Sequence, residues 1–239
     1  SGCGKTTLMR MVNAMVTPTS GRVFVRGEDV AGEDPVRLRR SIGYVLQEGG
    51  LFPHRSIADN IATVPRLEGA TKQASRERAL ELLTLVGLDR EMADRYPAQL
   101  SGGQRQRVGV ARALANRADI LLMDEPFGAL DPIVRADLQR ELKEIQRALG
   151  TTILFVTHDV DEAFTLGDQV AVLSAGGHIE QVGSPAELLS SPASPFVAEF
   201  VGASRAARPV HVAGPDGLVV DDAGTPVGTL ARDEAGDRP

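Results

Sequence analysis

Two segments about one helix length apart constrain this chain most. Leu100-Ser101-Gly102-Gly103-Gln104 predicts the start of a helix, where unpaired backbone N–H groups and a hydroxyl can face an anion. Residues 120–123 form an apolar run that ends in two carboxylates, Asp124 and Glu125, which suit a metal ion and a water molecule. Alone, the Ser-Gly-Gly triplet is more often an ordinary helix N-cap. Together, the two segments predict half of a site that hydrolyses a nucleoside triphosphate.

The first seven residues predict the phosphate-binding part of the same site. Gly4, Lys5 and Thr6 fit the last three places of the P-loop pattern G-x-x-x-x-G-K-[ST], whose first glycine would precede residue 1, so we expect a truncated loop. In such a loop, backbone N–H groups surround the phosphates, Lys5 reaches the β and γ phosphates, and the Thr6 hydroxyl binds Mg²⁺. Cys3 is expected to be a small loop residue, because no nearby histidine or acid is arranged to activate it.

Composition narrows the class of protein. With 239 residues and 42% apolar residues, the chain can bury a full core, as one large domain or two modest ones. The net charge is 26 minus 32, or −6, without a long basic block, so nucleic acid is not an expected partner. A single cysteine excludes an internal disulfide. Apolar runs fall far short of the roughly 20 residues that span a bilayer, so any membrane role is expected through a partner protein.

Periodicity predicts alternating helices and strands, and therefore an α/β fold with a mostly parallel sheet flanked by helices. In the first helix, Leu8, Met11, Val12 and Met15 are expected on one face, and Pro18 is expected to end it. Ala79, Leu82, Leu83 and Val86 form an apolar stripe typical of a core helix. The expected helices are residues 8–16, 36–40, 134–149 and 161–166, and residues 57–96 are helical in pattern with a break at Gly87-Leu88. The expected strands are residues 22–25, 42–46, 120–123, 151–156, 169–173 and 179–183.

Polar residues follow three of the strands that we expect in the sheet. Gln47 follows residues 42–46, Asp124 and Glu125 follow residues 120–123, and His158 follows residues 151–156. Ligands of open α/β folds bind at this carboxyl edge of the sheet. Each residue also has a structural interpretation, as a polar strand terminus, a helix cap or a packed histidine. Three arginines in the helix after Gln104 are expected to form a solvated face or ion pairs. They are Arg105, Arg107 and Arg112.

These motifs resemble those of the ATP-binding-cassette (ABC) ATPases. Residues 100–104 resemble the signature motif, residues 120–125 the Walker B motif, and residues 126–131 the D-loop. Gln47 resembles the Q-loop glutamine, and His158 resembles the switch histidine. The resemblance implies a P-loop NTPase fold of ABC type, with an ATPase domain at residues 1–202 and a helical subdomain at about residues 57–112.

The resemblance also implies ATP and Mg²⁺ as cofactors, together with a role for each motif. Asp124, Thr6 and Gln47 would hold the metal. Glu125 would orient and deprotonate the attacking water, and His158 and Gln47 would assist it. The signature motif would serve the nucleotide of the opposite subunit, so a homodimer or a paired ATPase subunit is expected. The residues expected to contact nucleotide are Ser1, Gly2, Cys3, Gly4, Lys5, Thr6, Thr7, Ser101, Gly102, Gly103, Gln104 and Asp131.

Four further segments look like the ATPase subunits of bacterial quaternary-amine importers, which take up glycine betaine, carnitine or choline. They are residues 27–30, 34–40, 49–54 and 128–133. This resemblance implies transmembrane permease subunits as partners, a substrate-binding protein indirectly, and a peripheral place at the cytoplasmic face of the membrane. Importers of amino acids, polyamines or sulfate share much of the same sequence. A soluble ABC ATPase without a transport role, or an inactive fragment, also remains open.

The last segment, residues 203–239, differs in composition from the rest. It is rich in glycine, proline and aspartate, and residues 218–228 predict a strand, a turn and a strand. This pattern is similar to the start of a cystathionine-β-synthase (CBS) motif. The alternative is a frayed tail, because so short a segment cannot build a core of its own.

Overall fold

The computed structural model describes residues 2–202, 210–213, 218–221 and 226–229. The chain forms two compact units. The first comprises Ser1–Leu166 and Leu173–His178, and the second comprises Gly167–Val172 and Ile179–Pro239. Among the described residues, no helix combines the length and apolar character needed to cross a membrane.

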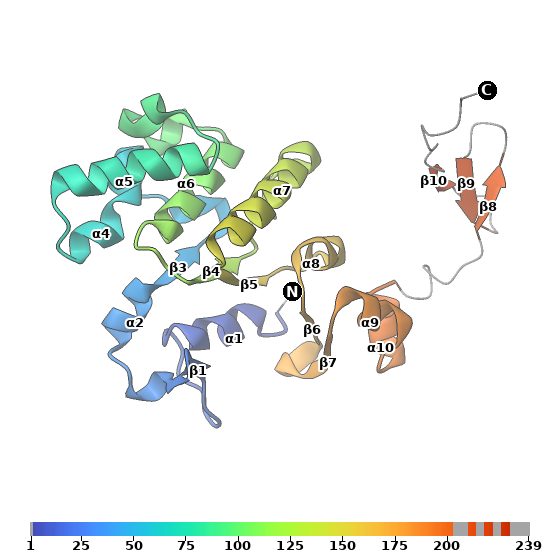
Figure 1. Ribbon diagram of the computed structural model, residues 1–239. Coiled ribbons are helices and arrows are strands. Elements are labelled where there is room, and N and C mark those ends of the chain that lie inside the picture. The colour runs from blue at the N-terminus through green and yellow to red at the C-terminus, as the bar shows by residue number, and fades with distance from the viewer. Residues whose placement is uncertain (1, 203–209, 214–217, 222–225, 230–239) are drawn as a thin grey trace. The chain divides into compact units, whose positions relative to one another are not determined.

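The first unit alternates helices and strands (Figure 1). Most neighbouring helices of this unit are separated by a strand or by a short 3-10 turn. The elements in chain order are α1 (Lys5–Val12), β1 (Phe24–Val25), β2 (Glu28–Asp29), η1 (Val30–Gly32), α2 (Pro35–Ser41), β3 (Ile42–Val45), η2 (Gln47–Gly50), α3 (Ile57–Ile61), α4 (Thr63–Leu67), α5 (Lys72–Leu85), η3 (Arg90–Asp94), η4 (Pro97–Gln99), α6 (Gly102–Leu114), β4 (Ile120–Asp124), α7 (Pro132–Leu149), β5 (Thr152–Val156) and α8 (Val160–Leu166).

The centre of this unit is a parallel sheet in the order β3-β4-β5. Ile42 pairs with Ile120 at the start of β3 and β4, and Asp124 pairs with Val156 at the end of β4 and β5. In Figure 1, α1 lies on one side of these strands, and α5, α6 and α7 lie on the other. Parallel strands covered on both faces are the arrangement that the apolar runs predict.

The central strand β4 belongs to two hydrophobic clusters because successive side chains point to opposite faces. Leu121 and Met123 join the cluster of α3, α5, α6 and α7. Leu122 joins Met9 of α1 in the other cluster. All three β4 side chains are buried, which confirms that the strand is covered on both faces.

One glycine allows β3 and α6 to pack closely. A Cβ on Gly43 would lie 2.3 Å from Leu121 Cδ2 and 2.5 Å from the carbonyl oxygen of Ala113. Real Cβ contacts are not this short, so the position requires glycine because of its surroundings. Gly43 thus allows β3, which leads into Gln47 and η2, to lie against α6.

The first helix differs from the prediction at its end and in its buried face. It ends at Val12, well before Pro18, because the N–H groups of Met15 and Val16 both bond back to the carbonyl of Arg10. Ala14 has φ 55°, which lies outside the helical region. Of the four residues expected on one face, Leu8, Met11 and Val12 lie within the helix, whereas Met15 lies beyond its end and Met9, outside that set, is the buried residue.

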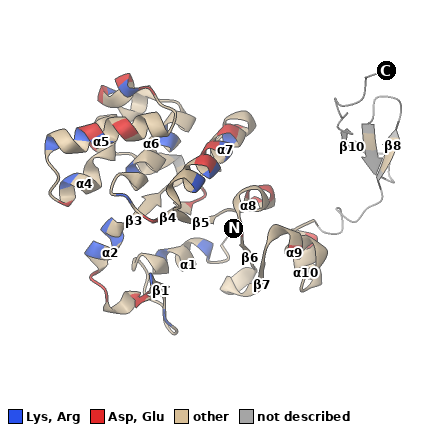
Figure 2. Ribbon diagram, viewed as in Figure 1, with Lys and Arg blue, Asp and Glu red and all other residues tan. Residues whose placement is uncertain are grey.

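Two other expectations were partly wrong in extent. The expected strand at residues 22–25 contains only Phe24–Val25, paired antiparallel with β2. The segment 57–96 is divided into α3, α4, α5 and η3. The apolar stripe from Ala79 to Val86 is buried, as predicted. Acidic and basic residues are mixed along α5 and α7 (Figure 2).

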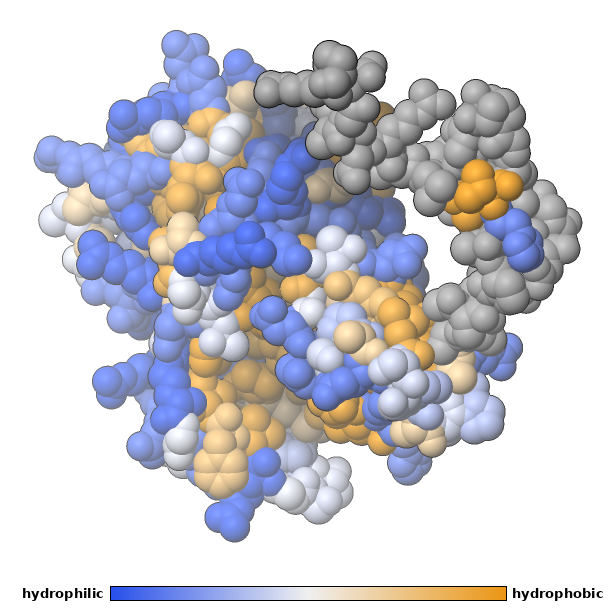
Figure 3. Space-filling model, turned by 45° about the vertical axis from the view of Figure 1, so that its right-hand side comes forward, coloured by the Kyte–Doolittle hydropathy of each residue, from blue (hydrophilic) through white to orange (hydrophobic). Residues whose placement is uncertain are grey.

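The second unit contains two small sheets and two short helices. Strands β6 (Val170–Leu173) and β7 (Ile179–Gly183) pair with each other and precede α9 (Pro185–Ser190) and α10 (Pro195–Phe200). An antiparallel sheet in the order β10-β9-β8 consists of Val210–Ala213, Leu218–Asp221 and Pro226–Thr229. The strands expected near residues 218–228 therefore form as β9 and β10. Residues 203–209, 214–217, 222–225 and 230–239 of the predicted tail lie outside the described residues. Apolar patches interrupt the polar surface on the face drawn in Figure 3.

Candidate nucleotide-binding site

The loop before α1 has the backbone shape of an anion-binding turn. Gly2 and Gly4 have φ values of 85° and 93°, in the left-handed region that favours glycine. Gly4 is the N-cap of α1. Because glycine has no side chain, it makes no side-chain hydrogen bond to the N–H groups of the first turn. The N–H groups of the first helical turn, which begins with Lys5, Thr6 and Thr7, therefore remain available for an anion. Ser1 lies outside the described residues.

The P-loop residues meet the Walker B carboxylate. Thr6 Oγ1 donates a hydrogen bond to Asp124 Oδ1 at 2.9 Å, although the two residues are 118 positions apart in sequence. Arg10 Nη2 lies 4.0 Å from the other carboxylate oxygen of Asp124. Lys5 Nζ donates to Cys3 Sγ at 3.5 Å. The structure thus brings together residues that the sequence assigned to phosphate and metal binding.

Glu125 and His158 form a second pair at the same sheet edge. His158 Nδ1 lies 3.3 Å from Glu125 Oε2. The backbone N–H of Glu125 donates to the carbonyl of Val156, which extends the β4–β5 pairing by one residue. Glu125 has φ 45°, an uncommon conformation for a residue other than glycine. This turn at the strand end leaves the carboxylate facing the histidine that follows β5.

Gln47 reaches the same neighbourhood from β3. A Cβ on Gly128 would lie 3.8 Å from Gln47 Nε2 and 3.7 Å from Glu125 Oε2, so both side chains border Gly128. Gln47 is exposed at the start of η2. All three strands of the sheet therefore contribute a polar residue to one edge.

A partly buried arginine of α6 holds the turn that carries Gln47. Arg112 donates to the carbonyl oxygens of Gly49 and Gly50, each at 2.8 Å. Burial lowers the pKa of Arg112. Arg107 forms the expected ion pair, with Glu141, whereas Arg105 donates to the carbonyl of Leu100 and Arg112 to those of η2. Sequence patterns missed the Arg112 contacts, because their partners are backbone carbonyls.

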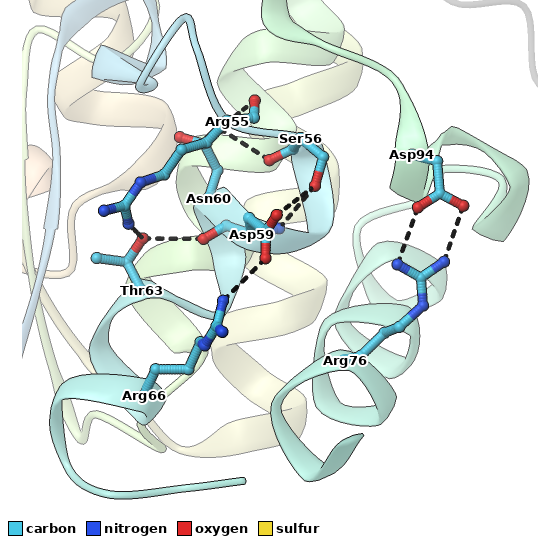
Figure 4. A network of polar contacts seen from close by, with 8 residues as sticks. All are labelled: Arg55, Ser56, Asp59, Asn60, Thr63, Arg66, Arg76 and Asp94. Atoms are coloured by element: carbon cyan, nitrogen blue, oxygen red, sulfur yellow. Dashed lines mark hydrogen bonds and ion pairs between the residues drawn. The ribbon is translucent and has the colours of Figure 1, made fainter. Parts of the chain in front are cut away.

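The loop after η2 is held by a second residue that the sequence did not single out. Asn60 is fully buried, and its Oδ1 accepts from the N–H of Phe52 at 2.7 Å. Its Nδ2 donates to the carbonyls of Phe52, Arg55 and Ser56. Figure 4 shows Asn60 beside Arg55 and Ser56 within this polar network. The segment between Gln47 and α3 is therefore fixed at both ends.

The signature residues start α6 and pack on the start of α7. Ser101 Oγ accepts the N–H of Gln104, and Gln104 Oε1 accepts the N–H of Ser101, which is a capping box. The helix-cap interpretation of Ser101 therefore holds in this chain. Asp131 similarly caps α7 through Val134 N–H. A Cβ on Gly103 would lie 2.7 Å from Val134 Cγ1.

The signature and the P-loop are not joined within the chain. Among the described residues, no hydrogen bond connects residues 101–104 with residues 2–7. The predicted site residues therefore form two groups. One group comprises the P-loop and the polar ends of the three strands, and the other comprises Ser101 to Gln104 with Asp131.

The first group fits a nucleoside triphosphate with Mg²⁺. The Thr6 hydroxyl and the Asp124 carboxylate supply hard oxygen ligands side by side, and Lys5 with the free N–H groups supplies positive potential. The described residues contain no cluster of three or more acids, histidines or cysteines that could hold a metal alone. Mg²⁺ commonly uses one or two protein ligands and completes its shell with phosphate oxygens and water, so the sparse donor set suits this ion.

Comparison with known proteins identifies the family. The family model described as ABC transporter matches residues 1–128. The chain therefore belongs to the ABC transporter family.

Its relatives are ATP-binding proteins of importers and other transporters. The chain is 56% identical over 205 residues to the glycine betaine/carnitine/choline transport ATP-binding protein of Bacillus subtilis, covering 86% of this chain and 54% of that protein. It is 47% identical over 231 residues to the spermidine/putrescine import ATP-binding protein of Frankia alni, covering 94% and 49%. The chain thus spans about half the length of these relatives.

Solved structures show the same α/β cassette fold. A dimeric ATP-binding cassette in a post-hydrolysis state with ADP and Pi matches with TM-score 0.67 and 33% identity, over 76% of this chain and 81% of that one. A component of an ABC transporter complex from Clostridium perfringens matches with TM-score 0.72 and 30% identity, over 80% and 76%. The predicted fold class is confirmed.

Proposed function

We propose that this chain hydrolyses ATP with Mg²⁺ and that residues 1–202 are its ATPase domain, including a helical subdomain at about residues 57–112. The observation that carries the proposal is the meeting of two pairs at one sheet edge. Thr6 contacts Asp124, and Glu125 faces His158. Residues 203–239 would form a separate tail, with a partial CBS-like segment as its candidate identity.

Each residue in the first group has a chemical task. When bound, ATP supplies the γ-phosphoryl group, and Mg²⁺ neutralises part of the charge on that group. Lys5 and the N–H groups of residues 2–7 would bind phosphate oxygens, and Ser1, which the sequence also assigns to nucleotide binding, lies outside the described residues. Thr6, Asp124 and Gln47 would hold the Mg²⁺ ion. These residues mainly position and neutralise charge, which is how proteins catalyse phosphoryl transfer.

The remaining residues act on the attacking water. The Glu125 carboxylate accepts its proton, and Gln47, which borders the same glycine, helps to orient it. His158 keeps its imidazole beside Glu125 Oε2 and faces the same water. The turned backbone of Glu125 supports this role, because strained backbone is often found at functional sites.

We further propose that the signature group serves a second ATPase subunit. Ser101, Gly102, Gly103, Gln104 and Asp131 would contact the nucleotide of a homodimer partner or of a paired ATPase subunit. The dimeric state of a similar cassette supports this, as does the lack of a described hydrogen bond between residues 101–104 and residues 2–7.

We propose that hydrolysis powers import of a quaternary amine such as glycine betaine. The names of relatives that are 50–56% identical support this substrate class. The partners would be transmembrane permease subunits and, indirectly, a substrate-binding protein. The chain would lie at the cytoplasmic face of the membrane. Polyamine import is a second candidate, because the Frankia alni relative is 47% identical over more of the chain.

Hydrolysis is tested by Glu125→Gln. We expect the variant to bind ATP and form dimers but to lose about a hundredfold or more in turnover, because a general base typically contributes 10²–10⁴-fold. The matched control is Glu144→Gln, which neutralises an exposed glutamate of α7 and should leave turnover unchanged. Turnover of Glu125→Gln equal to that of the control would remove Glu125 from this role.

The substrate is tested in cells. We expect disruption of the gene for this chain to abolish uptake of labelled glycine betaine or choline, while uptake of labelled spermidine continues. Loss of spermidine uptake alone would instead support the polyamine candidate.

A further inference from the structure

One guanidinium on α7 joins the segment after Glu125 to the loop that carries His158. Arg135 Nη2 donates to the carbonyl oxygen of Leu130, in the D-loop segment 126–131, at 3.2 Å. Its Nη1 donates to Asp159 Oδ2, also at 3.2 Å. Its Nε lies 3.9 Å from Glu162 Oε1 on α8. A single side chain thus contacts both segments that flank the proposed reaction site.

The His158 loop is held on both sides by the same network. Before the histidine, Thr157 Oγ1 donates to Glu162 Oε2 at 2.6 Å and accepts the N–H of Asp159 at 3.0 Å. After it, Asp159 Oδ1 accepts the N–H of Asp161 and caps α8. Because both neighbours of His158 are fixed, the position of its ring depends on where this network lies.

Charge and burial make Arg135 difficult to replace. Glu162 is 4% exposed, and Arg135 is the only cation in ion-pair contact with it among the described residues. Removing the cationic partner of a buried carboxylate leaves an uncompensated buried charge and strongly destabilises the folded protein. The three contacts of Arg135 use separate nitrogens of one planar fork, which the single ammonium of lysine does not reproduce.

We propose that Arg135 is a positioning residue that sets His158 relative to Glu125 according to the position of the D-loop segment. A shift of Leu130 would move the guanidinium of Arg135. Asp159 would move with it, and so would the adjacent His158. The inference rests on the proposed ATPase function, since His158 and Glu125 act there on the attacking water. Arg135 itself contacts neither of them in any described hydrogen bond or ion pair.

The test compares Arg135→Gln with Arg140→Gln. Arg140 lies on the same helix, is exposed, and among the described residues has one ion-pair partner, Asp137, three residues earlier. In the nucleotide-free protein, the ring signal of His158 in a ¹H–¹³C NMR spectrum, assigned with His158→Asn, should shift in Arg135→Gln and stay in place in Arg140→Gln. The kcat of Arg135→Gln should fall by about tenfold or more with a KM for ATP near that of the wild type, because small misplacements of catalytic groups can cost up to a hundredfold.

Two further variants make the test specific to His158. Arg135→Lys should recover only part of the lost kcat. In a His158→Ala background, Arg135→Gln should cause no further loss, whereas an additive loss would overturn the proposal. If Arg135→Gln does not fold, Asp159→Asn weakens the same link without leaving the Glu162 charge unpaired, and it should show the same changes on a smaller scale.

The outcomes for the two proposals are distinct. Absence of ATP hydrolysis in the wild type would contradict the proposed function, while the NMR comparison would still decide whether Arg135 positions His158. Wild-type hydrolysis together with an unshifted His158 signal in Arg135→Gln would overturn the positioning role alone.

Discussion

Replacing Gly43 by alanine should separate two elements that position the site. The added methyl group would lie 2.3 Å from Leu121 Cδ2 and 2.5 Å from the Ala113 carbonyl oxygen. The leucine side chain can rotate away, but the carbonyl belongs to the backbone of α6. Relief therefore requires β3 and α6 to move apart.

The size of the effect follows from two opposing contributions. Overpacking a core typically costs 1–3 kcal/mol, and a backbone obstacle places Gly43→Ala near the upper value, at about 3 kcal/mol. Replacing glycine restricts the unfolded chain and offsets about 0.4–1 kcal/mol. The expected loss is about 2 kcal/mol in the free energy of unfolding, which is a shift of about 0.7 M in the urea midpoint for a slope of about 3 kcal/mol/M.

Urea unfolding followed by circular dichroism measures this loss. The matched control is Gly32→Ala, because a Cβ at Gly32 would have no atom within 4 Å and its backbone is not left-handed. The control should unfold at or slightly above the wild-type midpoint. Equal midpoints for Gly43→Ala and Gly32→Ala would refute the steric reasoning.

Two other predictions concern contacts around the sheet. Asn60→Ala should lower the free energy of unfolding by about 2–3 kcal/mol, because it removes the hydrogen bonds that the buried Asn60 side chain makes to the backbone of the Phe52 loop, and limited proteolysis should then cut that loop faster. Arg26 lowers the pKa of Asp119, so this pair stabilises the fold above the unfolded pKa of the aspartate, and the stabilisation is lost as pH falls through the lower folded pKa. Arg26→Gln should therefore be less stable than the wild type at neutral pH, with urea midpoints that converge as the solution is acidified; a constant difference would contradict the linkage.

Elements with both faces buried were predictable from sequence. The run at residues 120–123 indicates a strand covered on two sides, and its residues divide between two hydrophobic clusters as the pleat requires. The end of α1 was not predictable in this way. It is set by backbone hydrogen bonds to the carbonyl of Arg10 and by the conformation of Ala14, neither of which changes the hydrophobic pattern.

The same distinction applies to the site. Thr6, Asp124, Glu125 and His158 carry side-chain chemistry in recognisable motifs, and the parallel sheet brings the ends of its strands together. Arg112 and Asn60 instead bind backbone carbonyls and an N–H group. Every residue has such backbone groups, so the sequence around their partners carries no mark of the contact.

The capping box at Ser101 affects how substitutions in the signature motif are interpreted. Removing the hydroxyl would weaken the start of α6 by about 1 kcal/mol, independently of any nucleotide. A loss of turnover in Ser101→Ala would therefore combine helix fraying with any lost phosphate contact. Aspartate is an equally good N-cap but brings a negative charge. Ser101→Asp keeps the helix start and repels an approaching phosphate, so it separates the architectural contribution of this serine from its contribution to recognition.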